Sequence, residues 1–174
     1  MKKRALVSVS DKTGVVDFCK SLVKNGYEII STGGTYKLLK ESGVSAIEID
    51  EVTKFPECFE GRVKTLNPYV HGGILHRRDK QSHLDQAKEL NVEAIDLVCV
   101  NLYPFKETIE RTDDFDDIIE NIDIGGPAMV RSAAKNFDAV IIVTNVEDYS
   151  EVIDAIENEK NTKDFRRGYM IKAY

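Results

Sequence analysis

Two cations stand two residues apart in the segment 61–68, which reads GRVKTLNP. Arg62 offers a planar guanidinium fork for phosphate or carboxylate groups, and Lys64 offers a point charge that can release its proton. In an extended segment the two side chains would point to the same side. The segment therefore predicts one wall of an anion-binding site, with a basic surface loop as the alternative interpretation.

A second candidate is the stretch Thr32-Gly33-Gly34-Thr35, which follows a predicted strand and opens a predicted helix. Free N–H groups at a helix start bind anions well when no side chain blocks their approach. The stretch is neither a Walker loop nor the G-x-G-x-x-G dinucleotide fingerprint. It predicts a phosphate cradle, with a purely structural strand-to-helix turn as the alternative.

Residues 8–14, which read SVSDKTG, follow the first predicted strand. Lys12 lies just before a predicted helix, where the helix dipole disfavours a cation. An anion that shares the site would explain this placement. A simply solvated lysine is the alternative.

Three further residues could take part in chemistry, and each has a structural alternative. Asp123 precedes a bare Gly125-Gly126 backbone, which suits a turn that faces a ligand, but it could equally cap the next helix. Lys135 lies near the end of that helix, where a cation is favourable for dipole reasons alone. Tyr103 follows a buried strand and either packs or faces a ligand.

The composition limits the classes of function. The chain has 174 residues, 42% of them hydrophobic and 31% charged, and a net charge of -6, which suits one globular domain without a basic field for nucleic acid. Three widely spaced cysteines do not form a disulfide framework, which favours a reducing cytoplasm. The apolar runs are too short for a signal peptide or a membrane span. The three histidines match no zinc signature, so no metal site is predicted.

Hydrophobic patterning predicts strands at residues 5–9, 27–31, 44–49, 96–102 and 139–144. Helices are expected between and after them, at 15–23, from 32–35 to Gly43, and at 79–90, 115–119, 127–136, 146–157 and 164–174. Residues 70–75 fit a short strand or a helix. The unpatterned segment 50–67 predicts a long loop, which in a compact domain is usually either functional or disordered. The alternation predicts an α/β fold with a mostly parallel sheet and helices on both faces.

Ligands of open parallel sheets bind outside the carboxyl ends of the strands. Four segments are expected to meet at that edge, namely 8–14, 31–35, 101–104 and 123–126. Together with Arg62 and Lys64 they predict a site for a small phosphorylated ligand. The last helix carries no stop signal before Tyr174, so we expect the chain to be a fragment, or a further domain to follow it.

Six motifs occur in the order SVSDKTG (8–14), STGGT (31–35), GRVKTLNP (61–68), VHGGIL (70–75), NLYPF (101–105) and NIDIGGPAMVRSAAKN (121–136). In this combination the chain closely resembles the N-terminal IMP cyclohydrolase domain of the bifunctional purine biosynthesis enzymes, over nearly its whole length. The resemblance implies a methylglyoxal-synthase-like three-layer sandwich at residues 1–160. Residues 161–174 would begin the connection to an AICAR transformylase domain.

The resemblance also implies the reaction, which is the cyclisation of 5-formamidoimidazole-4-carboxamide ribotide (FAICAR) to IMP with loss of water. This activity belongs to the hydrolases acting on cyclic amidines. No metal or organic cofactor is implied for this domain, while 10-formyltetrahydrofolate would be the co-substrate of the transformylase. A cytoplasmic homodimer that binds small nucleotides, and neither nucleic acid nor membrane, is expected.

Residue by residue, four positions match the catalytic positions of the family. Lys135 would donate and accept the proton, Lys64 would stabilise the oxyanion, Asp123 would orient the carboxamide, and Tyr103 would position a polar group or water. Two lysines in one site would lower each other's pKa. The nucleotide-binding positions implied by the resemblance are Ser8, Ser10, Asp11, Lys12, Thr13, Thr32, Gly33, Gly34, Thr35, Arg62, Thr65, Asn101, Ile124, Gly125 and Gly126.

One residue departs from the family pattern, which usually reads KTLHP. Asn67 stands in place of the histidine, so a proton-transfer role at this position is lost while a hydrogen-bonding role survives. Two alternatives share the fold and the cradle. Methylglyoxal synthase would need its own aspartate and histidine pattern, which is not seen. A non-catalytic module that binds a phosphorylated effector, as in carbamoyl phosphate synthetase, would not need Lys64, Asp123 and Lys135 together.

Overall fold

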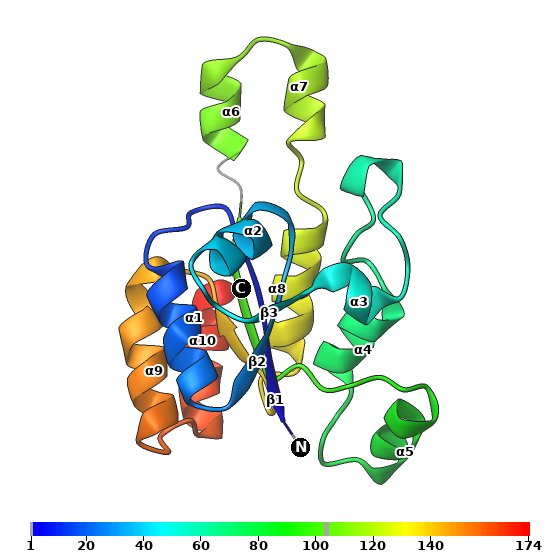
Figure 1. Cartoon of the computed structure of the whole chain (residues 1–174), viewed down its shortest axis with the longest axis vertical. Coiled ribbons are helices and arrows are strands. Elements are labelled where there is room, and N and C mark those ends of the chain that lie inside the picture. Colours follow the sequence, from blue (N-terminus) through cyan, green and yellow to red (C-terminus); the bar gives the residue numbers. More distant parts are fainter. Residues whose placement is uncertain (1, 103–104) are drawn as a thin grey trace.

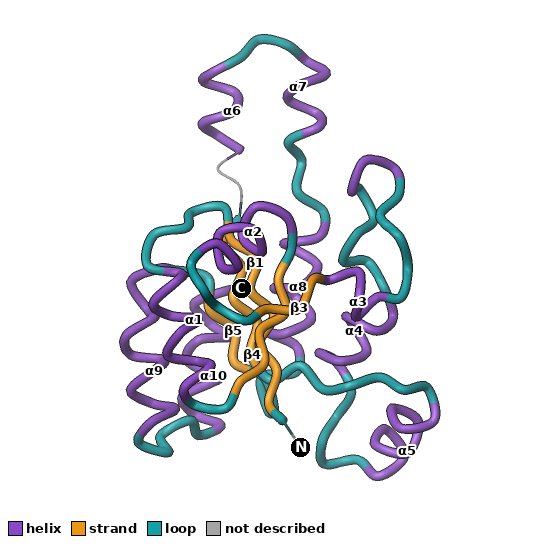
Figure 2. Tube along the Cα trace, in the orientation of Figure 1, coloured by secondary structure: helices purple, strands orange, loops and turns teal. Residues whose placement is uncertain are grey.

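The computed structural model describes residues 2–102 and 105–174. Within these residues the centre of the protein is a five-stranded parallel sheet in the order β3-β2-β1-β4-β5 (Figure 1 and Figure 2). The prediction of an α/β fold with a parallel sheet is confirmed. The strands are β1 Lys3–Val9, β2 Tyr27–Ser31, β3 Ala46–Glu48, β4 Leu97–Asn101 and β5 Ile141–Val143.

Helices cover both faces of the sheet and make a three-layer sandwich (Figure 1). α1 (Val15–Lys24) and α9 (Tyr149–Glu157) pack together on one side, whereas α4 (Pro68–Leu75) and α8 (Gly125–Lys135) pack together on the other. α2 (Gly33–Glu41) contacts α1, β1 and β3. The remaining helical segments are α3 Ile49–Thr53, η1 Phe59–Gly61, α5 Gln81–Glu89, α6 Phe105–Arg111, α7 Phe115–Glu120, η2 Val146–Asp148 and α10 Lys163–Ala173.

The core lies around the central strand β1 and its neighbour β4, as their continuous apolar runs predict. Leu6 in β1 and Val98 in β4 are fully buried, and each such side chain stabilises the fold by about 1.5–3 kcal/mol. Cys19 and Cys99 are buried free thiols, as expected, and burial raises the pKa of both. Cys58 is also free, so the described cysteines form no disulfide.

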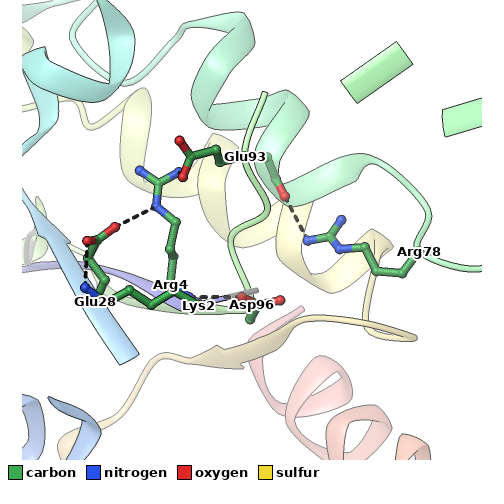
Figure 3. A network of polar contacts seen from close by, with 7 residues as sticks. Lys2, Arg4, Glu28, Arg78, Glu93 and Asp96 are labelled. Carbon is green, nitrogen blue, oxygen red and sulfur yellow. Dashed lines mark hydrogen bonds and ion pairs between the residues drawn. The ribbon is translucent and has the colours of Figure 1, made fainter. Parts of the chain in front are cut away.

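A polar network closes the amino ends of the strands (Figure 3). The Arg4 side chain is 8% exposed, and its Nε lies 3.4 Å from a carboxylate oxygen of Glu28. The Arg4 backbone amide donates to Asp96 Oδ2 at 3.0 Å, and Arg78 donates to the carbonyl of Ile95 at 3.0 Å. These contacts join segments of the fold that are distant in the sequence. Arg4 is the buried charge among them, and its pairing with Glu28 is what is expected of a charge in an interior.

α10 packs on the same core rather than leaving it. It contacts β5 and α8, its Tyr169 is 7% exposed, and Arg166 donates to the carbonyls of Phe137 and Asp138 at 2.9 and 2.8 Å. Thr162 caps the helix by accepting the Phe165 amide at 3.2 Å. α10 therefore packs against the sandwich, and that residues 161–174 begin a connection to a further domain stays a prediction.

Several boundaries differ from the predictions. The segment predicted as a loop at 50–67 holds the short helix η1 and all of α3 except its first residue, Ile49. The ambiguous segment 70–75 belongs to the helix α4. α6 was not predicted, and α8 begins at Gly125, two residues before Pro127. Among the described residues, no helix is long and apolar enough to cross a membrane.

Candidate functional site

A cleft of about 700 Å³ opens at the carboxyl edge of the sheet, between the ends of β1 and β4. At this point the chain connections lead away in opposite directions, from β1 towards β2 and β3 on one side and from β4 towards β5 on the other. Such a switch point is where parallel α/β sheets bind their ligands. All four segments expected to meet at this edge contribute to the lining of the cleft. The contributions come from around Ser8–Lys12, from Thr32, from Asn101 and from Asp123–Gly126.

The start of α2 is tied firmly to the end of β1. The Thr35 hydroxyl, 3% exposed, accepts the Val9 amide and donates to the Val9 carbonyl, both at 3.1 Å. The hydroxyls of Ser8 and Thr32 are 2.7 Å apart. Gly33 has φ 48°, a left-handed conformation that favours glycine. These bonds hold the free amides of the α2 N-terminus in a fixed place beside the cleft.

The loop after β1 is supported from β4. Asn101 Oδ1 accepts the amides of Ser10 and Asp11 at 2.6 and 2.9 Å, and its Nδ2 donates to the Asp11 carbonyl at 2.9 Å. Hydrogen bonds from Thr13 hold the pKa of the Asp11 carboxyl below its ordinary value. Asn101 thus shapes the loop, while Asp11 and Thr13 bond to each other and lie outside the cleft lining.

Lys12 reaches over the start of α2. Its Nζ lies 3.4 and 3.3 Å from the carbonyls of Val9 and Ser10, and its Cε would be 3.5 Å from a Cβ built at Gly34. A positive charge near a helix N-terminus is electrostatically unfavourable, whereas an anion between the two would be attracted by both. The geometry therefore forms a cradle for an anionic group.

The segment 59–67 forms a second wall, but it is not extended. Arg62 has helical dihedral angles, φ -59° and ψ -24°, and the Leu66 amide bonds the Val63 carbonyl in a turn. The prediction that Arg62 and Lys64 point to the same side assumed an extended segment, and that assumption is wrong. Both residues nevertheless line the cleft. Residues 59 and 60 have positive φ angles of 52° and 55°, which redirect the chain before this turn.

Both cations of this wall are already paired with carboxylates. Lys64 Nζ lies 2.8 Å from Glu57 Oε2, and the Lys64 side chain is 22% exposed. The Arg62 guanidinium contacts both carboxylate oxygens of Glu120, with Nε 3.3 Å from Oε2. Lys64 also borders a second cavity of about 260 Å³ behind the wall.

Asp123 and the two glycines form the third wall. Asp123 Oδ1 accepts the Gly126 amide at 2.8 Å, although the N-cap residue of α8 is Ile124. Asp123 thus satisfies a free amide of the helix start from one residue before the N-cap, which is close to the role given as its structural alternative. A Cβ built at Gly125 would lie 2.5 Å from the Thr65 hydroxyl, and one at Gly126 would collide with Asp123. Glycine is thus required at position 125 by the close approach of Thr65 and at position 126 by that of Asp123.

Most of the predicted site residues meet in this cleft. Those that line it are Ser8, Ser10, Lys12, Thr32, Arg62, Lys64, Thr65, Asn101, Asp123, Ile124, Gly125 and Gly126. The lining does not include Gly33, Gly34 and Thr35 of α2, nor Asp11 and Thr13 of the first loop. Tyr103 lies outside the described residues.

Lys135 is not brought to the cleft within this chain. It is the exposed last residue of α8, whose first residue lines the cleft, so ten helical residues separate the two by about 15 Å. The expectation that Lys64 and Lys135 share one site is therefore not met in a single chain. The position of Lys135 fits its structural alternative, because a cation is favourable at a helix C-terminus.

Sequence reasoning missed two acidic residues of the lining, Glu60 and Glu120. Glu120 bonds Arg62, which is 58 positions away, so no local spacing pointed to it. In the part of the chain that the structure describes, no group of three His, Cys, Asp or Glu side chains could hold a metal ion.

The fold and the site define the class of protein. The chain belongs to the family of MGS-like domains, whose family model matches residues 14–128, and a second model, described as AICARFT/IMPCHase bienzyme, matches residues 133–174. The solved crystal structure of ForH superimposes with a TM-score of 0.87 and 35% identity, over 99% of this chain and 92% of that chain. The expected fold family is confirmed.

More particularly, the chain is similar to the N-terminal part of the bifunctional purine biosynthesis protein PurH. It is 54% identical to PurH of Clostridioides difficile (strain 630) over 174 residues, which are 100% of this chain and 34% of that protein. It is 59% identical to PurH of Lactobacillus acidophilus over 161 residues, which are 92% of this chain and 31% of that protein. The chain thus spans about a third of the length of these relatives.

Proposed function

We propose that the cleft is an IMP cyclohydrolase site, which closes FAICAR to IMP with loss of water. The observation that carries this proposal is the meeting of an anion cradle, Lys64 and Asp123 in one cleft of about 700 Å³. A volume of this order is typical of small-molecule sites. Similarity to PurH, a purine biosynthesis protein, supports the same conclusion.

The nucleotide 5′-phosphate would lie between Lys12 and the N-terminus of α2. The free amides of α2 supply donors, and the ammonium of Lys12 lies close to Gly34 on the other side. Ser10 and Thr32 add hydroxyl groups to the same part of the lining. Arg62 and Thr65 would hold the rest of the nucleotide from the opposite wall.

In the reaction, the carboxamide nitrogen forms a bond to the formyl carbon of the same molecule, and water then leaves. An amide is a weak nucleophile, so the site must hold the two groups in near-attack geometry. Lys64 would stabilise the charge that grows on the formyl oxygen, and Glu57 holds its ammonium at 2.8 Å. Asp123 would accept a hydrogen bond from the carboxamide while its other oxygen caps α8. Bond formation and loss of water balance in this reaction without a cofactor.

Lys135, which the resemblance implies as the proton donor and acceptor of the cyclisation, lies outside the lining of the cleft in this chain. The cleft of this chain offers Lys64, Asp123 and bound water for proton transfer. Tyr103 stays a proposal for positioning a polar group. Within the whole protein we propose an AICAR transformylase that uses 10-formyltetrahydrofolate, and a cytoplasmic homodimer.

Two measurements on the purified chain test the function. Calorimetric titration should show binding of IMP, and absorbance should show conversion of FAICAR to IMP. Binding of IMP without turnover by well-folded protein would favour the alternative, a non-catalytic module that binds a phosphorylated effector. Absence of both binding and turnover would contradict a nucleotide function for this cleft.

A further inference from the structure

Glu120 reaches across the cleft from the hairpin of α6 and α7, which projects from the body of the protein (Figure 1). Its two carboxylate oxygens contact the guanidinium of Arg62, which belongs to the opposite wall. A guanidinium fork that holds two carboxylate oxygens makes the same contact that it would make with an anionic ligand. Glu120 therefore occupies Arg62 in the way a ligand would.

The charges in the lining balance, and Glu120 is the carboxylate that bonds its Arg62. The lining holds three cations, Lys12, Arg62 and Lys64, and three carboxylates, Glu60, Glu120 and Asp123, so it has no net positive charge. Asp123 is held by the Gly126 amide. Among the described residues, Glu120 is the carboxylate that hydrogen-bonds Arg62.

The position of Glu120 is not explained by the stability of its helix. It is the last residue of α7, where the helix dipole disfavours a negative charge. The ion pair is also open to water, since the side chains of Arg62 and Glu120 are 62% and 53% exposed. Exposed pairs of this kind are weak, so an incoming anion can displace the carboxylate.

We propose that Glu120 competes with the ligand for Arg62 and thereby lowers the affinity of the cleft for anionic nucleotides. The ligand must displace the Glu120 carboxylate before Arg62 can bind it. Because Glu120 is the last residue of α7, the displacement breaks its hydrogen-bonded link to the wall 59–67. This inference rests on the proposed nucleotide function of the cleft.

The test compares the dissociation constants of IMP for the chain and for the variants Glu120→Gln and Glu120→Ala. Both variants should bind IMP more tightly, by about two- to fivefold, since exposed ion pairs have strengths of that order. Asp116→Asn is the matched control, because Asp116 is an exposed acid of the same helix that makes no ion pair among the described residues. It should leave the dissociation constant unchanged.

A double-mutant cycle with Arg62→Ala separates competition from a general charge effect. In the Arg62→Ala background, Glu120→Gln should no longer change the affinity for IMP. Equal or weaker binding by both Glu120 variants would overturn the inference, as would a gain of equal size for Asp116→Asn. If neither the chain nor any variant binds IMP, both the proposed nucleotide function and this inference fail. If the chain binds IMP and the Glu120 variants bind it no more tightly, only this inference is overturned.

Discussion

The side-chain oxygen of Asn101 accepts the backbone amide of Ser10 at 2.6 Å and so joins the end of β4 to the loop after β1. The two residues are 91 positions apart in the sequence. The contact crosses the switch point of the sheet, at the base of the cleft. Asn101 therefore acts on the cleft chiefly through the shape of the loop that it holds.

Asn101→Ala removes three hydrogen bonds to the loop at once. We expect the free energy of unfolding to fall by about 1–3 kcal/mol and the affinity for IMP to fall as the loop loses its shape. Urea unfolding and calorimetric titration measure the two effects. Asn158→Ala, which removes an amide at the exposed end of α9, is the control and should leave IMP binding unchanged.

Asp123 has a structural and a chemical role, and two variants separate them. Asn is as good a helix cap as Asp, so Asp123→Asn should keep the stability of the chain while FAICAR cyclisation falls at least about tenfold. Asp123→Ala should lose about 1 kcal/mol of stability as well, because the Gly126 amide loses its acceptor. Thermal unfolding and a FAICAR absorbance assay provide the readouts. Full activity in Asp123→Asn would restrict Asp123 to helix capping.

Lys12 lies near the N-terminus of α2 and Lys135 lies at the C-terminus of α8. Because the helix dipole disfavours a cation at the first end and favours one at the second, removing the two charges should have opposite effects on stability. Lys12→Ala should reduce IMP affinity by about tenfold or more, because a charge-assisted contact is lost, while stability stays constant or rises slightly. Lys135→Ala should lower stability by about 0.3–1 kcal/mol and leave IMP affinity unchanged. Titration and urea unfolding of both variants check the pair. A loss of stability without a loss of affinity in Lys12→Ala would mean that Lys12 is not part of the cradle.

Asn67 caps α4, since its Oδ1 accepts the Tyr69 amide at 2.8 Å. This is the hydrogen-bonding role that survives the departure from the family pattern. Asn67→Asp should keep the cap, whereas Asn67→Ala should lower the free energy of unfolding by about 1 kcal/mol. Urea unfolding measures both. Equal stability of the two variants would show that the cap contributes little.

The local pattern of the sequence predicted those features whose cause is local. The continuous apolar run at 97–100 indicated a strand buried on both faces, and the glycines of the stretch 32–35 indicated a helix start open to ligands. The α6 segment FKETIER was missed because it carries two apolar side chains, Phe105 and Ile109, which are too few to show a helical period.

Features set by tertiary contacts could not be predicted in this way. The pair of Arg62 and Glu120 joins residues 58 positions apart, and nothing near either residue indicates the other. Lys135 shares a motif with the glycines of the cleft, yet the rise of 1.5 Å per residue along α8 carries it to the far end of the helix. Nearness in sequence was misleading there because the intervening residues are helical.

His71 in α4 and His76 at the C-cap of this helix are half-buried, and they predict how stability depends on pH. Burial lowers the pKa of His71 and of His76 below the ordinary value, so the unfolded chain binds more protons than the folded one in this range. Stability is then fully present above the unfolded pKa of about 6.5 and falls as pH drops below it. Asp11 and Asp79 have lowered pKa values and act only at more acidic pH.

We therefore expect the free energy of unfolding to decrease between about pH 7 and pH 5. The double variant His71→Gln and His76→Gln should flatten this part of the profile, since glutamine does not titrate. Its stability at pH 7.5 is expected to be lower, because His71 bonds the Ser132 hydroxyl at 2.9 Å and His76 donates to the Gly72 carbonyl at 2.8 Å. Urea unfolding at half-unit pH steps measures the slope. An equally steep profile in the double variant would assign the pH dependence to other groups.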